Sequence, residues 1–230
     1  MRRLVFVALA LAPLLSAASE GAKRLDAAAD VLSEVMSAPD KGIPEELLAN
    51  AHCIVVVPAL KTAAFVFGAK YGKGYLSCRS KNGTGWSAPG TVRIEGGSFG
   101  FQIGGSETDV IMLVMNDSGA GRLLSSRFTL GAEGSIAGGP VGRTATAQTD
   151  AQMHAEILSW SRSQGLFAGI ALEGATLRQD LDDNAQLYGA KLDNREIVTQ
   201  QVRAPKSAGR LLALLNKYSR HKHAEATSRR

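Results

Sequence analysis

Residues 86–105, WSAPGTVRIEGGSFGFQIGG, constrain the possible fold more than any other part of this sequence. They place one of only two tryptophans beside a Pro-Gly turn and continue as two strand-like segments separated by paired glycines. Val92 and Ile94 alternate with polar residues, and Phe99 and Phe101 alternate with small or polar ones, which is the period of a β-strand. Glycines inside such a pattern indicate bulges or close strand packing, so this stretch predicts tightly packed β-structure.

A possible catalytic motif lies inside the same stretch. Residues 96–100 match the G-x-S-x-G pattern around Ser98, and Asp109 and His154 follow in the order used by α/β-hydrolases. That motif requires a strand, a sharp turn and then a helix, whereas the alternation after Ser98 predicts that a strand continues. A serine hydrolase using Ser98 is therefore the least favoured function, and we predict that the chain is not an enzyme.

The remaining chain shows helical periodicity at both ends and strand signals between them. Helices are predicted over residues 20–36, 44–48, 177–188, 194–201 and 205–218, with a helical turn at 121–126. Strands are predicted over residues 53–57, 63–69, 74–79, 109–115, 144–147, 156–161 and 165–172, with a hairpin turn at 70–73 and another turn at 81–83. This order predicts an α+β fold, a single domain with a mainly antiparallel β core flanked by helices at the N- and C-terminal ends.

The first residues have the features of an export signal. Arg2 and Arg3 precede an apolar run of about a dozen residues, and small residues follow up to Ala18. We expect a signal peptide over residues 1–18, cleaved after Ala18, with no cysteine behind the cleavage site to accept a lipid. The protein is then periplasmic or secreted; an uncleaved helix that anchors the protein is the alternative.

The basic residues are concentrated at the C-terminal end. Without Arg2 and Arg3 the chain has 24 basic and 21 acidic residues, while residues 206–230 alone carry a net charge of +6. The preceding body is therefore acidic, which argues against a nucleic-acid-binding protein. We expect residues 220–230 to form a basic disordered tail. The final helix either docks its leucines on the sheet, which we favour, or lies on an anionic membrane.

The two cysteines, Cys53 and Cys78, predict a disulfide in an oxidising compartment. Closing a loop of about 25 residues contributes roughly 3 kcal/mol in the chain-entropy description. Two buried free thiols are the alternative. Two sulfur atoms without clustered histidines are too few ligands for a metal, and no motif indicates a cofactor, so we predict neither.

A set of motifs spread over nearly the whole chain resembles a known family. The motifs are YGKG at 71–74, GWSAP at 85–89, GSFG at 97–100, QIG at 102–104, TD at 108–109, GGPVGR at 138–143, SRSQGLFAG at 161–169 and NAQLYG at 184–189. In this order they resemble the SYLF domain, a lipid-binding module of bacteria, fungi, plants and animals. In yeast actin-patch regulators this domain stands beside an SH3 domain and also binds actin.

The resemblance implies a non-enzymatic domain, here over residues 19–219, that binds anionic phospholipids, with phosphoinositides as the usual ligands in eukaryotes. It also implies membrane contact by a basic, amphipathic segment at the domain's N-terminus. We expect Lys23, Arg24, Lys61, Lys70 and Lys73 to contact lipid, because they are basic and lie near the first helix or in the early strand loops. Since a periplasm lacks actin and phosphoinositides, a structural or protein-interaction module of the cell envelope, with no partner indicated, is the alternative.

Overall fold

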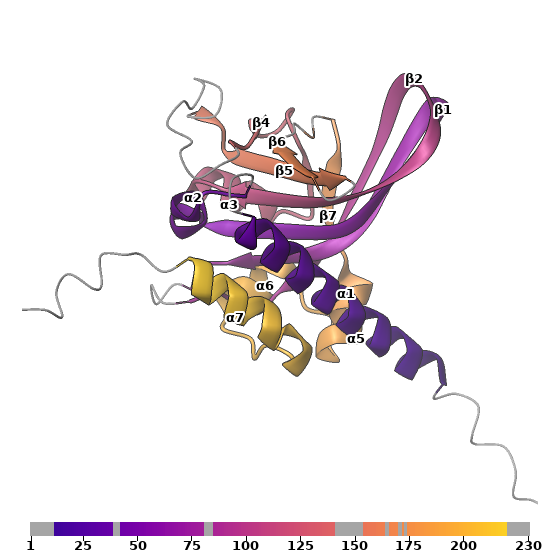
Figure 1. Ribbon diagram of the computed structural model, residues 1–230. Helices are drawn as coiled ribbons and strands as arrows, with labels where there is room; N and C mark the ends of the chain where they lie inside the picture. The colour runs from indigo at the N-terminus through magenta and orange to yellow at the C-terminus, as the bar shows by residue number, and fades with distance from the viewer. Residues whose placement is uncertain are drawn as a thin grey trace, which may run out of the picture.

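The computed structural model describes residues 12–38, 42–80, 85–140, 154–163, 166–169, 172 and 174–219 (Figure 1). The first eleven residues of the expected signal peptide, the turn predicted at 81–83, the strand predicted at 144–147 and the tail at 220–230 lie outside the described residues. The described chain forms one mixed domain in which a curled, mostly antiparallel sheet is flanked by helices from both ends of the chain. The predicted α+β class is therefore confirmed.

The elements follow the expected order with several changes of boundary. The helices are α1 (Ala12–Ser37), α2 (Glu45–Asn50), α3 (Asp117–Leu123), α5 (Leu181–Tyr188), α6 (Asn194–Thr199), the short 3₁₀ helix η1 (Lys206–Ala208) and α7 (Gly209–Tyr218). The strands are β1 (Cys53–Cys78), β2 (Gly90–Val114), β3 (Arg127–Thr129), β4 (Ile136–Gly138), β5 (Ile157–Ser163), β6 (Leu166–Gly169) and β7 (Thr176–Gln179).

The two long strands β1 and β2 form the centre of the fold. They pair antiparallel from Cys53 with Val114 to Leu76 with Gly90, and both double back so that the two halves of β1 lie side by side (Figure 1). A disulfide joins Cys53 to Cys78, the first and last residues of β1. Gly74 allows this close approach, because a Cβ atom there would lie 2.1 Å from the backbone oxygen of Val56.

Because β2 is long, further strands pair with both of its ends. The first part of β2, residues 92–95, pairs with β7, which in turn pairs with the edge strand β3. The last part of β2, residues 109–114, pairs with β5, which is flanked by β4 and β6. All these pairings are antiparallel except that of β4 with β5. One pair of long strands thus connects every other strand into a seven-stranded sheet.

Alternating side chains of β1 serve two separate apolar cores. Ile54 and Val56 pack under α1 and α7, whereas Val55 and Val57 pack on the other face with Phe128. This division follows from the two-residue period of a strand. The last helix, α7, packs mainly against α1 and α2, and its buried Leu211 and Leu215 share one core with Ile54 and Val56 of β1. Its leucines therefore dock in the core, as favoured from the sequence, with helices as the main neighbours and not the sheet alone.

Two predicted elements are wrong. The hairpin turn predicted at 70–73 lies within β1, where these residues pair with residues 93–96 of β2. The helix predicted from Leu177 is strand β7 up to Gln179, and the helix begins only at Leu181, because Asp180 caps it by accepting a hydrogen bond from the Asp183 backbone amide. Strands β3 and β4 were not expected as strands, and the helical turn predicted at 121–126 is helix α3.

Gly139 and Pro140, in the described part of the GGPVGR motif, allow close packing against a tryptophan. A Cβ atom at Gly139 would lie 2.0 Å from the Trp160 ring, and the Trp160 indole donates a hydrogen bond of 2.9 Å to the Pro140 carbonyl. The Trp160 side chain is fully buried. Glycine is therefore required here so that the chain can pass over the tryptophan.

Candidate functional site

The structure separates the five residues that the sequence suggested as lipid contacts. Lys23 is exposed on α1, and Arg24 lies one residue further along, facing the body of the protein. Lys73 is half-buried in β1. Lys61 and Lys70 lie apart from one another along β1, opposite Glu107 and Gly96 of β2. These five residues therefore do not form one basic surface.

Arg24 and Lys73 belong to an internal ion-pair cluster on α5. The Asp183 carboxylate lies 2.7 Å from the Arg24 guanidinium and 2.8 Å from the Lys73 ammonium, which also lies 2.9 Å from Asp180. Burial alone would lower the pKa of Lys73, but the hydrogen bonds to the two carboxylates outweigh it and raise that pKa. Both cations are thus neutralised within the protein, where they fasten α1 and β1 to α5.

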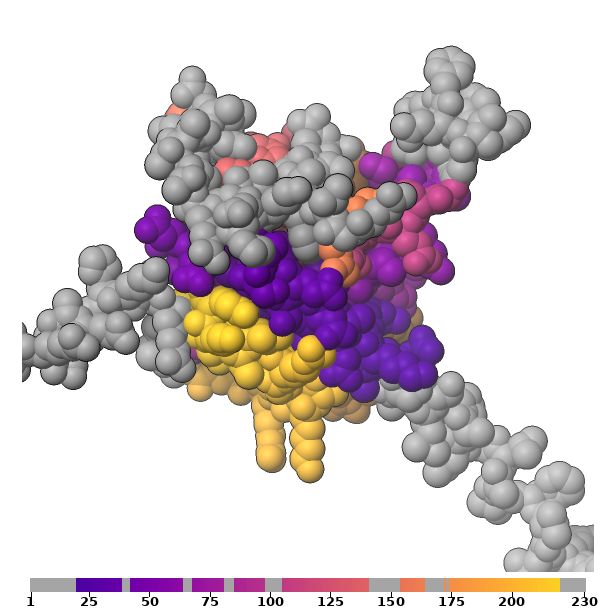
Figure 2. Space-filling model, viewed as in Figure 1, coloured from indigo at the N-terminus to yellow at the C-terminus, as the bar shows by residue number. Residues whose placement is uncertain are grey.

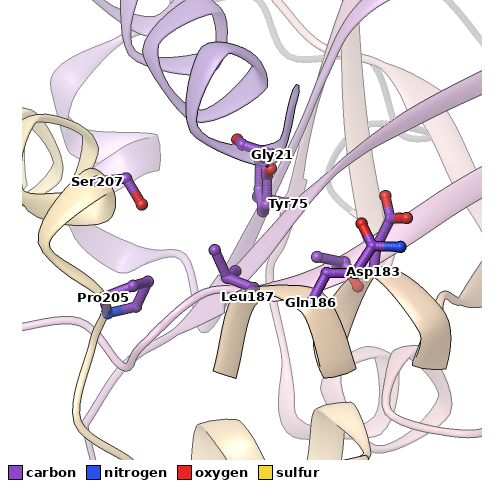
Figure 3. Close-up of a pocket in the computed structure, with 8 residues that line it drawn as sticks. Gly21, Tyr75, Asp183, Gln186, Leu187, Pro205 and Ser207 are labelled. Carbon is purple, nitrogen blue, oxygen red and sulfur yellow. Dashed lines mark hydrogen bonds between the residues drawn. The ribbon is translucent and has the colours of Figure 1, made fainter. Parts of the chain in front are cut away.

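A small pocket of about 180 Å³ lies beside this cluster, between α1, α5 and the segment leading into η1 (Figure 3). Tyr75 closes one wall by donating a 2.8 Å hydrogen bond to the Gly21 carbonyl, and Leu187 and Pro205 line the pocket with apolar surface. Pockets for small organic ligands usually exceed about 300 Å³. The pocket is therefore too small for a phospholipid headgroup together with its glycerol.

The outward face of α1 is acidic. Its exposed residues include Asp26, Asp30 and Glu34, at a spacing that places them on one side of the helix, with Lys23 as the basic exception. The apolar residues of α1, such as Leu25 and Leu32, are fully buried in the core. The resemblance implied a basic amphipathic segment at this end of the domain, and the described part of α1 does not have one.

Basic residues gather instead on the last helix. Lys206, Arg210 and Lys217 are all exposed and lie at intervals of four and seven residues, so they form one stripe, which we call the cationic stripe. Leu211 and Leu215 are buried on the opposite side. Residues 206–219 contain no acidic residue, and residues 220–230 add four basic residues against one glutamate. Arg210 also lies 2.6 Å from Asp30 of α1, so one cation of the stripe is shared with the acidic face.

A second prominent feature is the projecting part of the long strands. We define the arm as residues 61–70 of β1 together with residues 96–107 of β2, which pair from Lys61 with Glu107 to Lys70 with Gly96. In the described chain, no other strand pairs with these residues. The arm extends from the upper right of the body in Figure 1, on the side away from α7.

Neither a catalytic elbow nor a metal centre is found where the structure describes the chain. The backbone of β2 runs as a strand through Ser98 without the turn into a helix that a nucleophile elbow requires. Among the described residues, three or more metal-ligating side chains do not gather at any point. The described helices also include none with the length and apolarity needed to cross a membrane.

Comparison with known proteins identifies the family. The family described as "Ysc84: Las17-binding protein actin regulator" matches residues 95–218, which run from β2 through the cationic stripe to the end of α7. The chain belongs to the Ysc84, or SYLF, family. The resemblance suggested by the sequence motifs is thereby confirmed.

Similar proteins occur in fungi and animals. An SH3 domain-containing protein of Schizosaccharomyces pombe is 37% identical over 178 residues, which are 76% of this chain and 41% of that protein. Protein YSC84 of Saccharomyces cerevisiae is 32% identical over 197 residues, 82% of this chain and 42% of its own. The SH3 domain-containing YSC84-like protein 1 of Rattus norvegicus is 31% identical over 205 residues, which are 89% of this chain and 59% of that protein.

The chain therefore spans about two fifths to three fifths of the length of these relatives. The family name describes a binding and regulatory protein, and none of the three relatives' names describes an enzyme. The family description agrees with the binding module expected from the sequence. The cationic stripe was visible in the sequence as a basic final helix, but its residues were not among the expected lipid contacts.

Proposed function

We propose that this protein is an exported member of the Ysc84 family that binds anionic phospholipid surfaces through the cationic stripe on η1 and α7. The observation that carries the proposal is the exposure of Lys206, Arg210 and Lys217 on one side of a helix that lacks acidic residues. The leucines on the other side fix this helix to α1, so the stripe is presented on a rigid support.

The strength of such a contact follows from its charge. Each lysine or arginine close to an anionic leaflet contributes about 1 kcal/mol. Arg210 is already paired with Asp30, so Lys206 and Lys217 together contribute about 2 kcal/mol, which is about thirtyfold in affinity. The basic sequence of residues 220–230 adds to this attraction. The acidic face of α1 opposes this attraction where it borders the stripe, because α1 and α7 lie side by side (Figure 2) and Asp30 pairs with Arg210.

Export is part of the proposal. The basic and apolar residues before Ala18 have the features of a cleavable signal, and a disulfide between Cys53 and Cys78 suits an oxidising compartment. The protein recovered from the periplasm of an expressing bacterium should begin at Ser19. A mature chain that still carries residues 1–18 would contradict cleavage at this position.

Flotation with vesicles of phosphatidylcholine and phosphatidylglycerol tests the lipid contact. Replacing Lys206, Arg210 and Lys217 by glutamine should weaken binding at low salt by about thirtyfold, and high salt should weaken binding of the unchanged protein. A matched control replaces three other exposed cations, Lys23, Arg127 and Lys191, by glutamine. A specific contact through the stripe would be refuted if both variants lost binding equally, or if the stripe variant bound as well as the unchanged protein.

A protein partner is the second candidate, because the matching family is described as Las17-binding. A partner would bind the described domain or its basic end, and its capture should not require lipid. A pull-down that retains a defined partner with the unchanged chain and loses it with the glutamine variant, while vesicles are not bound, would favour this candidate over lipid binding.

A further inference from the structure

The end of the arm is free of charge over an unusually long stretch. Residues 62–69 and 96–106 contain no acidic or basic residue, although one fifth of the whole chain is charged. The same segments hold four of the seven phenylalanines of the chain, at positions 65, 67, 99 and 101. A soluble protein rarely presents a long uncharged projection unless that projection has a partner.

The strand register shows where the arm bends. Ala64 pairs with Gly104, and Val66 pairs with Gly100, so β2 advances four residues while β1 advances two. The two extra residues make the bend of β2 wider than that of β1, as is required when one strand curves around the other. The uncharged segments therefore meet at this bend, which is the part of the arm farthest from the body (Figure 1).

Charged and aromatic residues border the uncharged end. Lys61 pairs in register with Glu107, and the Lys61 side chain is 73% exposed. Tyr71, opposite Glu95, is 47% exposed and is one of two exposed large apolar or aromatic side chains among the described residues. The uncharged end is thus bordered by Lys61 and Lys70 and then by Tyr71. Tyrosine rings and the long stems of lysine are both found at membrane interfaces, where their polar ends reach the headgroups and water.

We propose that the end of the arm inserts into the interface of a lipid bilayer, as an apolar contact separate from the cationic stripe. A bilayer fits this projection better than a protein, because a stable protein interface needs about 800 Å² on each partner and a single strand bend offers little area. In the described chain β2 pairs with nothing but β1 along the arm, and unpaired backbone groups are costly in hydrocarbon. The insertion is therefore shallow.

This inference rests on the proposed membrane-binding function, but the two contacts can be tested apart. The arm holds only three charged residues, Lys61, Lys70 and Glu107, and the first and last of these form an ion pair. Insertion should therefore depend less on lipid charge and salt than binding through the cationic stripe does. Binding through Lys206, Arg210 and Lys217 requires anionic lipid and low salt. The arm also projects on the side away from α7 (Figure 1).

A tryptophan reporter tests insertion directly. In the variant Phe67→Trp, emission should be quenched by vesicles of brominated phosphatidylcholine and not by vesicles of unbrominated phosphatidylcholine. The native residues Trp86 and Trp160 are buried, at 8% and 0% exposure, and should respond equally little in the unchanged protein. The measurement is made at a vesicle concentration at which the protein floats with the vesicles. Insertion would be refuted if the fluorescence of the variant were quenched no more than that of the unchanged protein.

Flotation with neutral phosphatidylcholine vesicles at high salt gives an independent measurement. Phe67 and Phe99 are paired in register, and replacing both by serine should weaken this binding by about tenfold or more, whereas replacing both by leucine should change it little. Equal binding of the serine and leucine variants would overturn the inference. In that case the proposed function would still hold if the glutamine variant of the cationic stripe lost binding to anionic vesicles at low salt and the serine variant of the arm kept it.

Discussion

Replacing the buried Asn184 by leucine should destabilise the protein strongly, because this side chain joins α5 to the central sheet. Its carbonyl oxygen accepts a 2.8 Å hydrogen bond from the Thr91 backbone amide, and its amide nitrogen donates to the Leu192 carbonyl at 3.0 Å and to the Asn194 side-chain oxygen at 2.8 Å. Asn184 is fully buried, and Thr91 and Asn194 are 2% exposed. Leucine fills a similar volume but can make none of these bonds.

The expected loss can be estimated from the groups that are left without partners. The Thr91 amide and the Asn194 side-chain oxygen would be buried and unsatisfied, and each such group costs about 1–3 kcal/mol. The Leu192 carbonyl is half-buried, so water can replace its lost donor at little cost. The free energy of unfolding of the Asn184→Leu variant should therefore fall by about 2–6 kcal/mol.

Urea denaturation followed by tryptophan fluorescence measures this change. With a slope of about 2 kcal/mol per molar urea, a loss of about 4 kcal/mol lowers the midpoint by about 2 M. The matched control is Gln186→Leu on the same helix, where the side chain is exposed and the change should stay within about 0.5 kcal/mol. A midpoint for Asn184→Leu equal to that of the control would refute the stabilising role of this network.

Three further predictions concern stability. Replacing Cys53 and Cys78 together by serine should lower the free energy of unfolding by about 3 kcal/mol, measured by denaturation without reductant against the disulfide-bonded protein. Burial raises the pKa of Tyr75 from 10.0 to about 12, so its neutral hydroxyl contributes stability that is complete below pH 10 and is lost as the pH rises towards 12. The free energy of unfolding of the Tyr75→Phe variant should therefore fall less between pH 10 and pH 12, as measured by denaturation at a series of alkaline pH values. Gly139→Ala should destabilise the fold by at least about 1–3 kcal/mol, because the added methyl group collides with the Trp160 ring, and an unchanged melting temperature would contradict this packing.

The class of the fold could be predicted because periodicity is a local signal. The uninterrupted apolar runs around Val55 and Ile111 and the helical spacing around Leu32 and Leu211 are visible in the sequence, and the structure buries all four residues. The family could be predicted as well, because its motifs occur in order along nearly the whole chain. Those signals do not depend on which residues meet in space.

The errors arose where a local pattern has two physical causes. Gly72 suggested a hairpin turn at 70–73, but a side chain is excluded there because Leu60 in the other half of β1 lies against it, and no local rule distinguishes these cases. The segment from Leu177 was assigned to a helix by its spacing, although Asp180 is a good helix-capping residue and marks the true start. The pairing of Arg24 and Lys73 with Asp183 joins residues more than a hundred positions apart, which sequence alone could not show.

The disulfide between the ends of β1 has a mechanical consequence. Cys53 and Cys78 are the first and last residues of one strand, so the bond closes β1 into a covalent loop whose free end is the bend of the arm. A pull on the chain from outside this loop passes from Cys53 through the sulfur–sulfur bond to Cys78 and bypasses residues 54–77. Those residues cannot be extended by such a pull until the bond is reduced.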